Sequence, residues 1–199
     1  MIETDISKLD GFLRGCVPKV KSLVYYVQPG VDSEFFLLQT VYNTLKNGGY
    51  CVLVASSTIP DIMKSQFKEI GWDMQSFNER FFCVDAYNPL ISAPSKEKYV
   101  VSNPENNEEY NKIIINVIKE MLPCTIVFES LSTIMDLCGE KETIESVKAW
   151  NKMAMLNDHI MVYNFTAWPY SQETFNLIKG DLFNAVLEIG EIGECVVFG

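Results

Sequence analysis

A loop in the first part of the chain has the placement of a phosphate-binding loop. It follows an apolar run, precedes a helix-like run, and reads Val27-Gln28-Pro29-Gly30-Val31-Asp32-Ser33-Glu34. A working loop reads G-x-x-x-x-G-K-S/T, because its glycines admit phosphates to backbone N–H groups, its lysine neutralises charge and its hydroxyl holds magnesium. The four defining positions here are Val27, Asp32, Ser33 and Glu34. The placement indicates nucleotide chemistry, whereas the residues lack the groups for it.

The charges of this loop oppose a phosphate. Asp32 and Glu34 stand where glycine and a hydroxyl are needed, and the lysine is replaced by Ser33. A negative charge about 4 Å from a phosphate opposes binding by roughly 1 kcal/mol in water and about 4 kcal/mol near a protein surface. Since about 1.4 kcal/mol is a tenfold change in affinity, we expect a loss of several orders of magnitude. Both acids suit a helix start, so we predict that this helix stabilises its own N-terminus.

The loop requires a strand before it and a helix after it, and the chain repeats that alternation. Apolar runs predict strands at 22–28, 50–56, 80–86, 124–129, 159–165, 183–189 and 194–198. Helical patterns lie at 33–46, 60–70, 105–122, 142–156 and 172–178. Most strand runs are continuously apolar, which is typical of strands covered on both faces. We predict a three-layer α/β fold with a mostly parallel sheet, helices on both faces and a C-terminal β-hairpin.

One stretch fits neither pattern. Residues 87–107 contain prolines and many polar side chains, and they predict a long exposed loop that either contacts a partner or only connects two elements. The aromatic residues Phe165, Trp168 and Tyr170 leave two alternatives open, an exposed contact surface or part of the core.

Composition bounds the rest. The chain has 199 residues, 48% of them hydrophobic, which suits one domain over residues 1–199. Its net charge is −10, and residues 101–199 carry 6 Lys and Arg against 15 Asp and Glu. An acidic surface disfavours nucleic acid and anionic membranes, which bind through cationic contacts. No basic leader or long apolar stretch is present, so we expect a cytoplasmic protein with no membrane partner.

Cysteine and histidine usage argues against a metal site. The six cysteines show no ligand spacing, and His159 is the single histidine. Cys51, Cys83 and Cys124 lie in apolar runs and are expected to pack as core residues. His159 begins an apolar run, and we expect a structural role for it.

Several motifs together resemble the KaiC-like branch of the RecA superfamily of P-loop ATPases. The family's opening T-G-I-x-x-L-D-x-x-L-G-G-G-I-P-x-G is similar to Thr4-Asp5-Ile6-Ser7-Lys8-Leu9-Asp10 followed by Gly15-Cys16-Val17-Pro18-Lys19. Its L-G-W-D segment is similar to Ile70-Gly71-Trp72-Asp73. Its second nucleotide motif, hydrophobic residues followed by D-S-L-S, is similar to Thr125-Ile126-Val127-Phe128-Glu129-Ser130-Leu131-Ser132. The resemblance implies a RecA-like fold over nearly the whole chain.

The catalytic positions implied by the resemblance are also altered. The family's general base is a glutamate in an F-E-E-x-P context, and the equivalent stretch is Ser56-Ser57-Thr58-Ile59-Pro60. Neither Ser57 nor Thr58 can act as a carboxylate base. The aspartate of the second motif is replaced by Glu129, which precedes Ser130. Together with the loop at Val27, Pro29, Gly30, Asp32, Ser33 and Glu34, these positions predict a degenerate site with no catalytic residue, no cofactor and no metal.

The resulting hypothesis is a pseudo-ATPase. We expect a non-catalytic regulator or scaffold that acts through protein contacts, in signalling as the resemblance implies, with a copy of itself or an active paralogous ATPase as partner. The alternative is a nucleotide-binding sensor or weak ATPase with an unconventional loop, in which ATP and magnesium still bind. A RecA-like nucleic acid binder is opposed by the acidic balance.

Overall fold

The computed structural model describes residues 20–190 and 195–198. Its strands are β1 Ser22–Val27, β2 Tyr50–Ala55, β3 Phe81–Asp85, β4 Tyr99–Val100, β5 Cys124–Phe128, β6 Ile160–Thr166, β7 Ala185–Ile189 and β8 Cys195–Phe198. Its helices are α2 Glu34–Lys46, α3 Pro60–Glu69, a short 3-10 helix η1 Gln75–Phe77, α4 Tyr87–Leu90, α5 Asn107–Glu120, α6 Leu131–Cys138, α7 Glu140–Leu156 and α8 Gln172–Lys179. The opening motif 4–19 lies outside the described residues.

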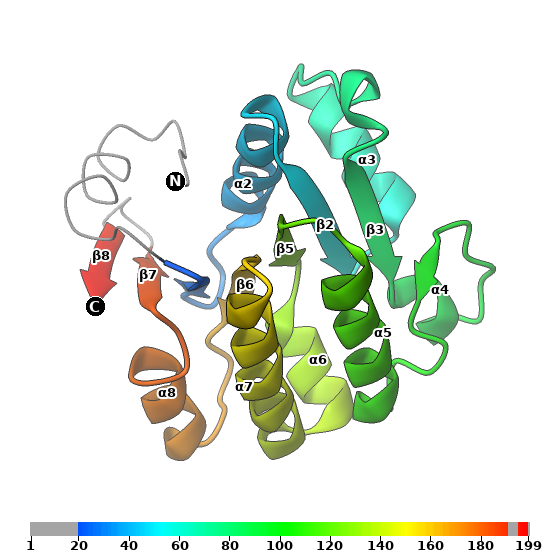
Figure 1. Cartoon of the computed structure of the whole chain (residues 1–199). Coiled ribbons are helices and arrows are strands. Elements are labelled where there is room, and N and C mark those ends of the chain that lie inside the picture. Colours follow the sequence, from blue (N-terminus) through cyan, green and yellow to red (C-terminus); the bar gives the residue numbers. More distant parts are fainter. Residues whose placement is uncertain (1–19, 191–194, 199) are drawn as a thin grey trace.

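The strands form one sheet in the order β4-β3-β2-β5-β6-β1-β7-β8. All neighbouring pairs among β1 to β7 are parallel, and β8 pairs antiparallel with β7. The predicted mostly parallel sheet with a closing antiparallel pair is therefore confirmed. Parallel strands end at one edge, so the segments after β1, β2, β5 and β6 lie near one another (Figure 1).

Helices cover both faces of the sheet, as predicted. Alternate residues of β1 point to opposite faces, because successive side chains of a strand alternate. Leu23 and Tyr25 belong to the core under α2 and α3, whereas Val24 and Tyr26 belong to the core under α5, α6, α7 and α8. The sheet is thus the middle of three layers (Figure 1).

Helix α6 was not predicted from the sequence, and it follows the second motif directly. The Ser130 hydroxyl oxygen accepts a hydrogen bond of 3.1 Å from the Thr133 backbone N–H and caps the helix. Gly139, at φ 94°, ends α6, and α7 begins at the next residue. Ser130 is therefore a helix cap.

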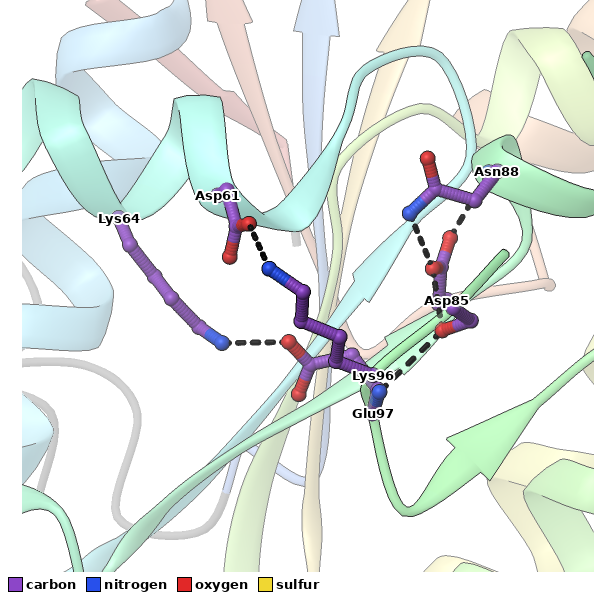
Figure 2. Close-up of polar contacts among 7 residues, drawn as sticks. Asp61, Lys64, Asp85, Asn88, Lys96 and Glu97 are labelled. Atoms are coloured by element: carbon purple, nitrogen blue, oxygen red, sulfur yellow. Dashed lines mark hydrogen bonds and ion pairs between the residues drawn. The ribbon is translucent and has the colours of Figure 1, made fainter. Parts of the chain in front are cut away.

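The expectation of a long exposed loop at 87–107 is wrong. This segment contains α4 and the edge strand β4, and Tyr99 and Val101 are buried. Its anchor is Asp85, a fully buried carboxylate at the end of β3 (Figure 2). Asp85 accepts hydrogen bonds from the Asn88 amide group at 2.7 Å, the Ser95 hydroxyl at 2.6 Å and the backbone N–H groups of residues 87 and 88. Burying a carboxylate requires such partners, so the segment folds around it.

Two ion pairs fasten the same segment to α3 (Figure 2). Lys64 pairs with Glu97, and the Lys96 Nζ atom lies 3.9 Å from Oδ2 of Asp61. The pKa of Lys64 is raised: burial lowers it, and the hydrogen bond and charge of Glu97 more than offset that effect. The segment is a packed part of the sheet edge.

His159 has the structural role expected of it. Its ring is fully buried at the start of β6, where Nδ1 accepts a hydrogen bond of 3.1 Å from the Cys124 backbone N–H and Nε2 lies 2.9 Å from the Ile118 carbonyl oxygen. Burial lowers the pKa of the imidazole, so the ring is held neutral. Cys51 and Cys83 are buried as well, and burial raises the pKa of the Cys83 thiol to about 12.

The aromatic residues at the end of β6 and just after it divide between the two alternatives. Phe165 is fully buried and belongs to the core. Tyr170 is half-buried and packs against it, with the ring centroids of Phe165 and Tyr170 5.3 Å apart. Trp168 is exposed and lies on the surface.

Candidate functional site

The predicted site positions meet at the carboxyl edge of the sheet. The loop 27–34 follows β1, Ser57 and Thr58 follow β2, and Glu129 and Ser130 follow β5. In open α/β sheets, this edge is where ligands bind. The fold thus brings together all three of the segments that the sequence singled out.

The first half of the loop closes on itself as a tight turn. The Val31 backbone N–H donates a hydrogen bond of 3.1 Å to the Gln28 carbonyl, with Pro29 and Gly30 between them. Gly30 has φ 85°, a value that glycine adopts without strain, and proline suits the position before it. The Gln28 side chain also donates a bond of 2.7 Å to the Glu188 carboxylate on β7. The turn is therefore held to the neighbouring strand.

The second half of the loop starts α2. Asp32 accepts a hydrogen bond of 2.9 Å from the Glu34 backbone N–H, in the first turn, where helix donors lack partners. Ser33 is buried, and its hydroxyl donates a bond of 3.0 Å to the Asn164 side-chain oxygen on β6. The Glu34 carboxylate accepts a hydrogen bond from Gln66 on α3. Each polar side chain of this half-loop is thus engaged within the protein.

Glu129 faces the segment after β2. Its carboxylate accepts hydrogen bonds from the backbone N–H groups of Ser56, at 3.2 Å, and Ser57, at 2.8 Å, and also from the Ser57 hydroxyl. Burial raises the pKa of this carboxyl, the bonds from Ser57 and Ser56 lower it, and the charge of Glu34 raises it further. The net direction of the pKa shift is upward, and burial is its main cause.

Asn164 joins the two groups of residues. Its side-chain NH₂ donates a hydrogen bond of 3.1 Å to the Glu129 carbonyl, while its oxygen accepts from Ser33. Ser33, Asn164, Glu129 and Ser57 thereby form a connected chain of hydrogen bonds, which we call the Ser33–Ser57 network. Asn164 was not predicted as part of the site. Its signal in the sequence is a polar residue near the carboxyl end of an otherwise apolar strand.

Two predicted positions lie beside this network. Thr58 is half-buried in the bend between β2 and α3. Ser130 caps α6, and its carbonyl accepts a hydrogen bond of 2.8 Å from the Ser56 hydroxyl. Ser56 therefore links the segment after β2 to the segment after β5 a second time.

The described residues hold neither a metal cluster nor a membrane span. Within 20–190 and 195–198, no group of three or more His, Cys, Asp and Glu side chains is placed to hold a metal ion. None of the helices described is both long and apolar enough to cross a membrane.

Comparisons with known proteins give a family model and a set of curated relatives. A family model described as the KaiC ATPase matches residues 2–166. A UPF0273 protein of Aeropyrum pernix is 27% identical over 136 residues, which are 67% of this chain and 55% of that protein. A UPF0273 protein of Sulfurisphaera tokodaii is 29% identical over 137 residues, which are 67% of this chain and 48% of that protein. The matched part of the chain thus spans about half the length of these curated relatives.

A solved structure shows the same fold. The crystal structure of a KaiC-like protein of the archaeon Pyrococcus horikoshii OT3 superposes with a TM-score of 0.62 at 14% identity. The superposition covers 89% of this chain and 76% of that one. This likeness supports the α/β architecture described above.

Proposed function

The chain belongs to the KaiC family of ATPases. We propose that it keeps the fold of this family and does not hydrolyse ATP. In this proposal it is a pseudo-ATPase that acts as a regulator or scaffold through protein contacts, in signal transduction. Its partner would be a copy of itself or an active paralogous ATPase. It would work as an oligomer and need neither nucleotide nor magnesium.

The observation that carries this proposal is the Ser33–Ser57 network. Phosphoryl transfer depends on a cation at the phosphates, a metal-bound hydroxyl and a group that positions the attacking water. Ser33 occupies the lysine position, and its hydroxyl is committed to Asn164. Ser57 is one of the two residues, with Thr58, at the position of the base, and its hydroxyl is committed to Glu129. The degenerate positions Ser33 and Ser57 are thus connected by hydrogen bonds through Asn164 and Glu129.

The residues present do not fit ATP with magnesium. A phosphate at the loop would meet the carboxylate of Glu34 at the position where a working loop has a hydroxyl. The turn closed by Val31 uses one backbone N–H that a phosphate loop would offer. We therefore assign no step of a reaction to this edge of the sheet.

A thermal melt with Mg-ATP tests the proposal. A ligand present at about 100 times its Kd stabilises a protein by about 2.7 kcal/mol, which is roughly 5–10 °C for a chain of this size. We expect no shift in Tm with millimolar Mg-ATP relative to magnesium chloride alone. We also expect light scattering to report the same oligomer with and without Mg-ATP.

A rise in Tm with Mg-ATP would favour the alternative function, a nucleotide-binding sensor or weak ATPase. Stabilisation by Mg-ATP with micromolar affinity would contradict the pseudo-ATPase and favour a nucleotide sensor. Release of phosphate in the same sample would favour a weak ATPase.

A further inference from the structure

A second surface of the molecule exposes apolar side chains beside the candidate site. Phe35 on α2 and Ile62 and Ile70 at the two ends of α3 are among the most exposed large apolar side chains, at 49%, 47% and 40%. Trp72 follows α3 and is half-buried. We call Phe35, Ile62, Ile70 and Trp72 the α2–α3 face.

These side chains form one continuous surface. Ile62, Gln66 and Ile70 are spaced four residues apart, so they lie along one side of α3. Gln66 donates a hydrogen bond to Glu34, which brings the start of α2, and with it Phe35, against the middle of that side. The rings of Phe35 and Trp72 are 5.8 Å apart. The face therefore spans from the candidate site to the end of α3.

The side chains beneath the face are closely packed. Trp72 stacks on Tyr42 of α2, with centroids 4.5 Å apart and planes inclined by 14°. Its backbone N–H donates a bond of 2.8 Å to the Phe67 carbonyl, and Phe67 is fully buried. A face held in place this way loses little conformational freedom when a partner binds.

Acidic residues adjoin the members of the face along the chain. Asp32 and Glu34 precede Phe35, Glu69 precedes Ile70 and Asp73 follows Trp72. Asp32, Glu69 and Asp73 are exposed, and Glu34 is half-buried. Of the nearby cations, Lys64 is paired with Glu97, whereas Lys68 is exposed. The rim therefore has an excess of negative charge, which steers cationic partners toward it.

We propose that the α2–α3 face binds a partner protein through a segment of apolar residues flanked by Lys or Arg. Exposed apolar patches rimmed by polar residues mark interaction sites, and aromatic residues are enriched where binding energy concentrates. A second copy of the chain fits less well, because face-to-face contact would oppose two acidic rims. This inference rests on the proposed function and narrows its partner to a different protein that carries such a segment, in place of a second copy of the chain.

An NMR titration of the full chain tests the proposal. The probe is a synthetic helical peptide of leucine and lysine, with a leucine–glutamate peptide and a serine–lysine peptide as controls. The indole N–H signals of Trp72 and Trp168 are assigned with Trp72→Phe and Trp168→Phe. We expect the leucine–lysine peptide to shift the Trp72 signal and leave Trp168 unmoved. Neither control peptide should shift Trp72 at the same concentration.

Paired variants locate the binding. The double variant Ile62→Ser, Ile70→Ser should bind the leucine–lysine peptide with at least tenfold lower affinity. The matched pair Leu122→Ser with Leu156→Ser removes similarly exposed apolar residues elsewhere and should leave affinity unchanged. Raising the ionic strength from about 0.05 M to about 0.5 M should weaken binding several-fold, because the rim charges are exposed.

Several results would overturn the inference. One is a Trp72 signal that does not move, and another is equal binding of the leucine–glutamate peptide. A Trp72 shift on dilution of the protein alone would assign the face to a second copy. If the double variant Leu9→Ser, Leu13→Ser moves the Trp72 signal in the absence of peptide, the chain's own N-terminal segment would be the occupant of the α2–α3 face.

The two proposals fail separately. Absence of peptide binding, with no response to Mg-ATP, would remove this inference and leave the pseudo-ATPase standing. Binding of Mg-ATP would remove the pseudo-ATPase whichever way the Trp72 signal behaves.

Discussion

The Ser57 backbone N–H donates a hydrogen bond of 2.8 Å to the Glu129 carboxylate, across 72 positions of the sequence. Ser57 and Thr58 stand after β2, in the stretch where the family resemblance places a catalytic carboxylate, and Glu129 stands after β5. A carboxylate is thus present after β5, as Glu129, but not at Ser57 after β2, and Ser57 donates its hydrogen bonds to Glu129. Two substitutions that look independent in the sequence are one contact in the structure.

Restoring the loop residues should restore some nucleotide binding. Asp32→Gly, Ser33→Lys and Glu34→Thr together remove two negative charges and supply the lysine and the hydroxyl. We expect Mg-ATP to raise the Tm of this variant without phosphate release, because Ser57 still cannot act as a base. The control, with Ser33→Ala in place of Ser33→Lys, lacks the cation and should respond less. No response from either would implicate Val27 or the turn at Gly30 instead.

Removing the Asn164 side chain should destabilise the fold. Asn164→Ala leaves the buried Ser33 hydroxyl and the Glu129 carbonyl without their partner, a loss of about 1–3 kcal/mol. Urea unfolding measures this as a lower midpoint with an unchanged slope. Asn176→Ala, which removes an exposed side-chain bond on α8, should change the midpoint little. Equal effects of both substitutions would contradict a structural role for the network.

His159 should titrate below its ordinary pKa of about 6.5. It is the single histidine, so its ring C2 proton can be followed by NMR without assignment. Burial lowers the pKa of the folded state, so the unfolded chain binds the proton more readily. The stability that this group contributes is therefore present above the unfolded pKa and is lost as the pH falls from about 7 toward the folded pKa. The loss is about 1.4 kcal/mol for each pH unit that separates the two pKa values. An apparent pKa at or above 6.5 would show that the ring is not held neutral.

Asp85 should control the segment beside the sheet edge. Asp85→Ala removes the acceptor for the Asn88 and Ser95 side chains, and we expect a loss of roughly 3 kcal/mol. Limited trypsin digestion should then cut after Lys96 or Lys98 faster than it cuts the wild-type chain, in which we expect the folded segment to resist cleavage. Asp181→Ala, an exposed acid elsewhere, provides the control. Protection that persists in Asp85→Ala would assign the anchoring to the Lys64–Glu97 pair.

All the described strands except β4 were predictable, because each is a short run of apolar residues bounded by polar ones. The edge strand β4, Tyr99–Val100, was missed because it lies within the polar, proline-containing segment 87–107. Most of the candidate site was predictable too, since parallel strands end at one edge. Helix α6 was missed because Ser130 belongs to a motif as well as to a cap, and nothing local separates the two roles. Asn164 was missed because its partners, Ser33 and the Glu129 carbonyl, are 131 and 35 positions away.

The segment 87–107 also shows that local sequence does not reveal distant contacts, here by predicting a loop where the structure has α4 and β4. Its prolines and polar residues are typical of a loop, and locally that interpretation is sound. Asp85 changes the outcome, because a buried carboxylate organises donors from several positions at once. A polar residue inside an apolar run is the visible trace of such an anchor.

The Ser33–Ser57 network also has an evolutionary consequence. Each member satisfies another, so replacing one leaves its neighbour unpaired, and paired substitutions should be non-additive in a double-mutant cycle. Under the proposed pseudo-ATPase function, a lineage that regained ATP hydrolysis one residue at a time would therefore pass through less stable intermediates. The contact between Ser57 and Glu129 would then make the loss of hydrolysis hard to reverse.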